Sequence, residues 1–135
     1  MSRENVEAFK RAIAAYNRRD IDAFLEEFDP EVEWHSLIQA MFGGKESVFR
    51  GQRGMRESVQ DMDEALADLQ VEHSEIRDLG ERIVVFGQVR GRGRASGAEF
   101  ESPLNWVVEL RGGRATRLRD YLDPKDALEA AGLRE

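Results

Sequence analysis

The amino-acid sequence predicts an α+β fold in which helices cover one face of an antiparallel sheet. Apolar residues in the first half recur at steps of three and four, as in helices, whereas the second half alternates in the manner of strands. Glycine-containing breaks separate the later segments at hairpin spacing, which favours antiparallel neighbours. A length of 135 residues suits one compact core, so we expect residues 1–135 to form a single domain.

Three amphipathic helices are expected in the first half of the chain. The first covers residues 2–18, and the second follows Asp20 and ends at Asp29-Pro30, because the residue before proline avoids helical geometry. The third begins at Gly51 and runs for about four to five turns. The apolar stripes of the three helices contain Val6, Phe9, Ile13, Tyr16, Ile21, Phe24, Leu25, Phe28, Met55, Val59, Met62, Leu66 and Leu69.

A short strand over residues 32–36 and a loop over 37–50 are expected between the second and third helices. The large apolar side chains of this loop suggest the rim of a pocket. Four further strands are expected over 71–79, 83–95, 98–110 and 115–122, separated by turns at Gly80-Glu81, Ser96-Gly97 and Gly112-Gly113. A last helix follows Asp123, with Pro124 at its first position and Gly132 just past its end.

The predicted turns set the register of the sheet. A two-residue turn at Ser96-Gly97 places Gln88 opposite Asn105 and forms two cross-strand Arg–Glu pairs, which support this register. A two-residue turn at Gly112-Gly113 places Asn105 opposite Asp120. The Arg–Glu pairs are Arg94 with Glu99 and Arg92 with Glu101, and the face that carries the polar row comprises Phe86, Gln88, Asn105, Val107, Leu118 and Asp120.

The polar row has two interpretations. A carboxylate flanked by two amides, on a face that is otherwise apolar, is typical of an oriented site within an apolar pocket. The same groups are also compatible with a buried hydrogen-bond network that only fixes packing. Both interpretations stay open at this point.

The opposite face of the sheet is also apolar. Val89, Trp106, Val108 and Tyr121 are expected there, with the bare backbone of Gly87 opposite the indole ring of Trp106. Monomers rarely expose an apolar patch of this kind. We therefore expect a homodimer that buries this outer face between two copies of the chain.

Composition narrows the partners and the chemistry. A net charge of −7 opposes contact with a phosphate backbone, so no nucleic-acid partner is expected. No apolar run is long enough for a membrane span or an export signal, which predicts a cytoplasmic protein without a membrane partner. Cysteine is absent, and His35 and His73 fall on different strands, so we expect neither a metal nor a cofactor. His35 is expected to point away from the pocket.

Four segments carry a resemblance to a known family: AAYNRRDID at 14–22, FDPEVEW at 28–34, FRG at 49–51 and LRDYLD at 118–123. Together and in this order they resemble the SnoaL-like branch of the nuclear transport factor 2-like superfamily. The resemblance implies a cone-shaped fold, in which a strongly curved sheet wraps around the N-terminal helices and encloses one deep pocket. It also implies a dimer through the outer face of the sheet.

This superfamily includes ketosteroid isomerase, polyketide cyclases and limonene epoxide hydrolase, so the resemblance alone does not select a reaction. Alignment with the isomerase puts Ser36 at its catalytic aspartate, Ala12 at its oxyanion tyrosine and Asn105 at its protonated aspartate. Ser36 cannot act as a carboxylate base, which excludes that mechanism. The Arg119-Asp120-Tyr121 motif resembles the hydrolase, but the second aspartate of the hydrolase has no counterpart.

Two hypotheses follow. In the first, which the incomplete catalytic sets favour, the protein binds a small hydrophobic molecule without catalysis. In the second, Asp120 is the acid–base residue of an isomerase, cyclase or hydrolase, and nearby polar groups orient the substrate or water. Both use a pocket whose expected wall comprises Tyr16, Trp34, Ser36, Met55, Val59, Phe86, Gln88, Arg90, Asn105, Val107 and Leu118.

Overall fold

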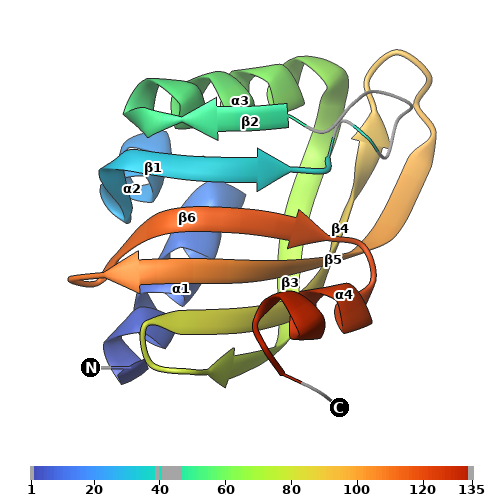
Figure 1. Ribbon diagram of the computed structural model, residues 1–135. Coiled ribbons are helices and arrows are strands. Elements are labelled where there is room, and N and C mark those ends of the chain that lie inside the picture. Colours follow the sequence, from blue (N-terminus) through green and yellow to red (C-terminus); the bar gives the residue numbers. More distant parts are fainter. Residues whose placement is uncertain (1, 39, 41–46, 134–135) are drawn as a thin grey trace.

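The computed structural model describes residues 2–38, 40 and 47–133 (Figure 1). In chain order the elements are α1 (Ser2–Asn17), α2 (Ile21–Glu26), β1 (Phe28–Ser36), β2 (Ser47–Arg50), α3 (Gly51–Ala65), β3 (Leu66–Asp78), β4 (Arg82–Gly93), β5 (Glu99–Arg111), β6 (Arg114–Tyr121) and α4 (Pro124–Ala130). This order confirms the α+β class. None of the described helices is long and apolar enough to cross a membrane.

The strands form one sheet in the order β2-β1-β6-β5-β4-β3. β1 and β6 are parallel, whereas every other neighbouring pair is antiparallel. The prediction of a wholly antiparallel sheet is therefore wrong at one pair. Successive hairpins carry the chain from β3 to β6, which arrives beside β1 running in the same direction (Figure 1).

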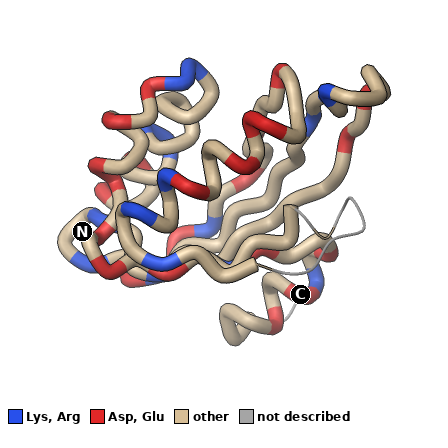
Figure 2. The backbone as a smooth tube through the Cα atoms, turned by 90° about the horizontal axis from the view of Figure 1, so that it is seen from above, with Lys and Arg blue, Asp and Glu red and all other residues tan. Residues whose placement is uncertain are grey.

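Helices cover both faces of the curved sheet, but unequally. We call the face that packs against α1 and α3 the inner face, and the face that packs against α4 the outer face (Figures 1 and 2). The main hydrophobic core lies on the inner face. A smaller cluster, comprising Val84, Val107, Ala127 and Ala131, lies between α4 and the outer face.

The predicted helices are present, with some ends shifted. The Asp20 side chain accepts a hydrogen bond from the backbone N of Ala23 at 3.2 Å, as expected of a helix cap. α4 begins at Pro124, directly after Asp123, as predicted. α3 ends at Ala65, because the next residue is already extended. Leu66 and Leu69 were predicted in that helix. They instead lie buried in β3, so their spacing of three residues does not reflect a helical stripe.

The loop predicted over residues 37–50 contains an additional strand. Its last four residues form β2, which pairs with β1 through contacts such as Trp34 opposite Phe49. The large apolar side chains proposed as a pocket rim belong in part to residues 41–46, which lie outside the described residues. The rim therefore stays a prediction.

The register between β4 and β5 differs from the prediction by two residues. Arg92 lies opposite Glu99 and Arg90 opposite Glu101, because the connection between these strands is longer than a two-residue turn. A shift of two keeps each side chain on the same face as its predicted neighbours. Arg90 nevertheless forms an ion pair with its other neighbouring strand, β3, where its Nε lies 3.3 Å from Glu72 Oε1.

The register between β5 and β6 differs by one residue, and this difference changes the faces. The pairing shifts at a bulge between Glu109 and Leu110 of β5. On the N-terminal side of this bulge, Trp106 lies opposite Asp120 and Asn105 lies opposite Tyr121. Because successive side chains point to opposite faces, a shift of one exchanges the inner and outer residues of β6 relative to β5. Asp120 and Asn105 therefore lie on opposite faces of the sheet, which contradicts the predicted polar row.

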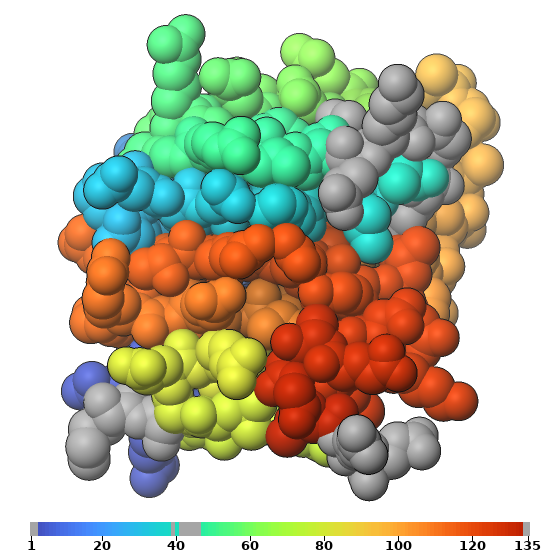
Figure 3. Space-filling view, in the orientation of Figure 1, coloured from blue at the N-terminus to red at the C-terminus, as the bar shows by residue number. Residues whose placement is uncertain are grey.

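The residues predicted for the dimer face divide between the two faces. Val89, Trp106 and Val108 are 0–4% exposed and belong to the main core, so their assignment to the outer face is wrong. Tyr121 lies on the outer face, against the cluster under α4. Figure 3 shows that α4 covers only part of this face and leaves β1 and β6 uncovered beside it. Association of two copies stays a prediction.

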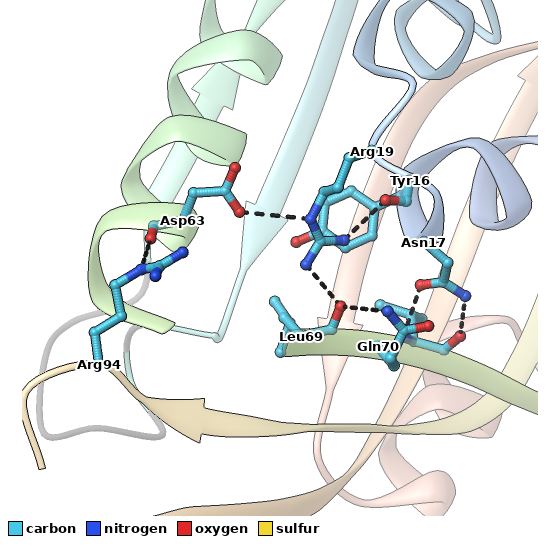
Figure 4. A network of polar contacts seen from close by, with 8 residues as sticks. Tyr16, Asn17, Arg19, Asp63, Leu69, Gln70 and Arg94 are labelled. Atoms are coloured by element: carbon cyan, nitrogen blue, oxygen red, sulfur yellow. Dashed lines mark hydrogen bonds and ion pairs between the residues drawn. The ribbon is translucent and has the colours of Figure 1, made fainter. Parts of the chain in front are cut away.

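The end of α1 is joined to β3 by side-chain hydrogen bonds to the backbone (Figure 4). Asn17 Nδ2 donates to Val71 O at 2.8 Å, and Val71 N donates to Asn17 Oδ1 at 3.0 Å. The amide thus satisfies both backbone groups of Val71 as a neighbouring strand would. Arg19 donates to Leu69 O at 2.8 Å and reinforces the same junction.

Replacement of Asn17 tests the importance of this junction. Asn17→Ala should lower the free energy of unfolding by about 1–3 kcal/mol, because both backbone groups of Val71 lose their partner. Urea unfolding followed by tryptophan fluorescence measures the change. Gln60→Ala removes an exposed amide from α3 and should change stability by no more than about 0.5 kcal/mol. Equal effects of the two substitutions would contradict the assignment.

Candidate ligand-binding site

A cavity of about 60 Å³ lies within the main core, between the helices and the inner face of the sheet. Almost all of its lining is apolar, and side chains from both halves of the chain contribute to it. The lining residues are Phe9, Ala12, Ile13, Tyr16, Phe24, Phe28, Trp34, Ile38, Met55, Met62, Leu69, Val71, Leu104, Trp106 and Leu118.

Part of the predicted pocket wall lines this cavity. Tyr16, Trp34, Met55 and Leu118 do so, and each is between 1% and 6% exposed. Ser36 and Val59 are also buried, but they do not line the cavity. The hydroxyl of Ser36 accepts a hydrogen bond from Ile38 N at 3.3 Å, so it supports the turn after β1.

The other predicted wall residues lie outside the cavity, on the outer face of β4 and β5. Phe86 and Val107 pack in the cluster under α4. Asn105 donates to the carbonyls of Tyr121 and Leu122 at 3.2 and 3.4 Å. Gln88 and Arg90 interact with Glu72 on β3. The prediction for these five residues is wrong. It placed them on the same face of the sheet as Asp120, but the bulge between β5 and β6 puts Asp120 on the opposite face.

Asp120 is 2% exposed on the inner face of β6, and its carboxylate is held by donors from β1 and the segment that follows it. Oδ1 accepts from Trp34 Nε1 at 2.8 Å, and Oδ2 accepts from Leu37 N at 3.0 Å. A buried carboxylate requires such hydrogen bonds to offset its lost hydration. Asp120 does not line the cavity itself. Its hydrogen bond holds in place Trp34, which does line the cavity.

Tyr16, Trp34 and Trp106 are the lining residues whose side chains carry an O–H or N–H group. The side chain of Tyr16 is 3% exposed, and its hydroxyl has no hydrogen-bond partner among the described residues. Burial raises the pKa of Tyr16 to about 12, although the nearby charge of Arg19 acts in the opposite direction. The hydroxyl is therefore protonated over the whole physiological pH range.

The tyrosine ring is held on two sides. The guanidinium carbon of Arg19 lies 4.7 Å from the ring centroid, and Figure 4 shows the two side chains stacked at the end of α1. Arg19 Nη1 also donates to Tyr16 O at 2.9 Å. On the other side, the ring of Phe24 lies 5.5 Å from that of Tyr16. These contacts fix the position of the hydroxyl relative to α1 and β3.

Several lining residues were not anticipated as pocket residues. Trp106 was placed on the outer face, yet its ring packs 5.7 Å from Phe9 of α1, and Leu104 of the same strand also lines the cavity. Leu69 was assigned to a helix and lines the cavity from β3. The size of the side chains could have predicted the inner face of β5. Of the two sets of alternating side chains on a central strand, the larger set belongs on the face with the larger core.

His35 points away from the cavity, as expected, because its neighbour Trp34 points into it. On the outer face, His35 Nε2 lies 2.6 Å from Glu33 Oε1. This hydrogen bond, together with the charge of Arg50, lowers the pKa of Glu33. No group of three or more metal-binding side chains occurs within the described residues.

Comparison with known proteins identifies relatives of the whole fold. The SnoaL-like domain family matches residues 9–118. Among curated proteins, none matches the chain significantly. An NTF2-like protein of unknown function from Burkholderia pseudomallei has a similar structure, with a TM-score of 0.78 and 23% identity over 93% of this chain and 95% of that one.

Two further similar structures were solved with small molecules. TerC, co-crystallised with polyporic acid, has a TM-score of 0.77 and 27% identity over 89% of this chain and 92% of that one. A protein with a ketosteroid isomerase-like fold from Catenulispora acidiphila, in complex with trimethylamine, has a TM-score of 0.76. Its identity is 16%, over 95% of this chain and 94% of that one, so this likeness shows the fold alone.

Substitution of Asp120 tests whether this residue supports the structure. Asp120→Asn should lower the free energy of unfolding by about 1–3 kcal/mol, because an amide NH₂ would replace one of two accepting oxygens. Urea unfolding measures the change, with Asp61→Asn on the exposed side of α3 as the matched control. A difference between the two variants of less than about 0.5 kcal/mol would refute the structural role.

Titration of Tyr16 tests the burial of its hydroxyl. The chain has two tyrosines, so in a Tyr121→Phe variant the tyrosinate absorbance at 295 nm reports on Tyr16. We expect a native midpoint at about 12, because burial disfavours the phenolate. The same variant unfolded in urea should titrate near ~10. A native midpoint equal to the unfolded one would show that the hydroxyl contacts water.

Proposed function

Because this chain belongs to the SnoaL-like family, we propose that it binds a small, mainly apolar molecule in the cavity between α1 and the inner face of the sheet. The apolar cavity is the observation that carries the proposal. Well-packed cores leave few voids larger than a water molecule, and a void with a nearly continuous apolar lining favours an apolar occupant over water.

The size of the cavity limits the occupant. At about 60 Å³ it is less than half of the ~150 Å³ of an engineered apolar cavity that binds benzene. Two lining residues, Met55 and Met62, have flexible side chains that can rearrange around a larger molecule. A compact ligand with few heavy atoms therefore fits directly, and a larger one requires these methionines to move.

The comparison with TerC supports a binding function of this type. That protein was co-crystallised with polyporic acid and shares 27% identity with this chain over most of both lengths. Fold similarity alone does not select a ligand, because this architecture carries many functions. The proposal for this chain therefore names the class of molecule and rests on the cavity.

The hydrogen bonds of Asp120 favour binding over the alternative function, an isomerase, cyclase or hydrolase that uses this residue as acid or base. An acid–base group must lie within hydrogen-bond reach of the proton that it transfers. Both oxygens of Asp120 accept hydrogen bonds from the protein, and the residue does not line the cavity. Catalysis by Asp120 would require it to exchange these bonds for contacts with a substrate.

A cavity-filling substitution tests the proposed function. We expect methylenecyclobutane, a hydrocarbon with five heavy atoms, to shift the ¹³C-methyl resonances of Met55 and Met62 saturably in the wild type. Ala12→Leu adds three carbons to the lining and should weaken this binding by at least about tenfold, because the probe and the new side chain compete for the same volume.

The control for this experiment is Ala14→Leu, which makes the same change on the exposed side of the same helix. This variant should bind the probe as the wild type does. Circular dichroism checks that both variants are folded. A folded Ala12→Leu variant with unchanged affinity, or a wild type that shows no saturable shift, would contradict binding in this cavity.

A further inference from the structure

Arg19 lies on the solvent side of the cavity wall, where α1 meets β3 (Figure 4). Its guanidinium carbon is 4.7 Å from the ring centroid of Tyr16, and its Nη2 donates to Leu69 O at 2.8 Å. Tyr16 and Leu69 line the cavity, whereas Arg19 does not, and 32% of the Arg19 side chain is exposed. At this point one tyrosine and one arginine are therefore stacked between the cavity and the solvent.

We propose that Arg19 and Tyr16 form a gate through which ligands enter and leave the cavity. The gate opens when the guanidinium moves off the tyrosine ring and the ring turns towards the solvent. This inference rests on the proposed function and adds to it the control of access to the same site.

A single guanidinium makes the contacts that keep the gate closed. It donates to Tyr16 O of α1 at 2.9 Å and to Leu69 O of β3, and its Nε lies 3.7 Å from Asp63 Oδ1 of α3. The ion pair is partly exposed and contributes little to stability. One movement of the arginine side chain therefore releases three elements at once, and water can replace the arginine at each acceptor.

The hydroxyl of Tyr16 favours an outward movement of the ring. The oxygen is buried and has no hydrogen-bond partner among the described residues, so no hydrogen bond holds the tip of the side chain. A ring that turns towards the solvent brings this hydroxyl to water and recovers the hydration that it lost on burial. The closed position is therefore less favourable for tyrosine than it would be for phenylalanine.

Backbone strain is concentrated at the same contact. Arg19 and Asp68, with φ of 63° and 56°, are the two residues other than glycine that have a positive φ in the described part of the chain. The guanidinium of Arg19 binds the carbonyl of Leu69, the residue directly after Asp68. Strained residues of this kind persist only where their surroundings hold them, and they occur at ligand clamps and switch regions.

A gate predicts a kinetic signature. If ligands pass only through the open form, the association and dissociation rates both scale with the population of that form. The affinity stays nearly constant, because Arg19 does not line the cavity and makes no contact with its contents. A residue that only supports the structure of the cavity would instead change the affinity.

Arg19→Ala tests the closing contacts. The exchange of methylenecyclobutane is measured from the line shapes of the ¹³C-methyl resonances of Met55 and Met62 during a titration. Loss of two hydrogen bonds should raise both rates by about 10- to 100-fold and change the affinity by less than about threefold. The matched control is Arg94→Ala, which removes an arginine that donates to Asp63 O but contacts neither Tyr16 nor Leu69. Its rates should equal those of the wild type.

Tyr16→Phe should have the opposite effect. Phenylalanine gains no hydroxyl hydration when the ring turns outwards, so the open form becomes rarer and both rates should fall by about 5- to 100-fold. The affinity should change by less than about threefold, because the apolar ring is retained. Tyr121→Phe removes a hydroxyl outside the cavity and should leave both rates unchanged.

Opposite rate changes in the two variants, at nearly constant affinity, support the gate. Unchanged rates in Arg19→Ala, or unchanged or faster exchange in Tyr16→Phe, would refute the gate and leave the cavity as a binding site. A wild type that shows no saturable shift would contradict the proposed function, and the gate with it. If Arg19→Ala does not fold, Arg19→Lys replaces it, and exchange should again be faster because one ammonium group does not reproduce the fork of the guanidinium.

Discussion

The alternation of side chains along β5 is the constraint on which the rest of the structure depends. Leu104, Trp106 and Val108 face α1, where they bury the apolar stripe of that helix. The bulge after Glu109 then determines which residues of β6 share the inner face. Through this bulge Asp120 comes to lie beside Trp106, while Asn105 lies on the outer face. One irregular residue pair therefore decides which polar groups approach the cavity.

The carboxylate of Asp120 acts as a connection between strands that are distant in the sequence. It joins β6 to Trp34 of β1 and to Leu37, at the edge of the one parallel pair in the sheet. A carboxyl group buried in this position lacks hydration, so the donors around it replace water, and it orients those donors in turn. The aromatic wall of the cavity thus depends on a carboxyl group that does not itself line the cavity.

The class of fold, most elements and part of the cavity wall were predictable, because their signals are local. The Asp20 and Asp123 caps and the periodic stripe of α1 act within a few residues of the sequence. The faces of the sheet were not predictable in this way. The bulge leaves Thr116 of β6 unpaired between the partners of Glu109 and Leu110, and neither Thr116 nor its two neighbours is a glycine that would mark the irregularity in the sequence. Whether a tyrosine hydroxyl has a hydrogen-bond partner likewise depends on residues far away in the chain.

Tyr16 also affects the stability of the protein itself. A buried hydroxyl without a partner costs about 1–3 kcal/mol compared with the same group in water. Phenylalanine at this position would keep the contacts with Phe24 and avoid that cost, so a sequence optimised for stability alone would carry it. Within the described residues, the Tyr16 hydroxyl is therefore a buried polar atom without a partner, held at the expense of a folding margin that is small in any domain of this size.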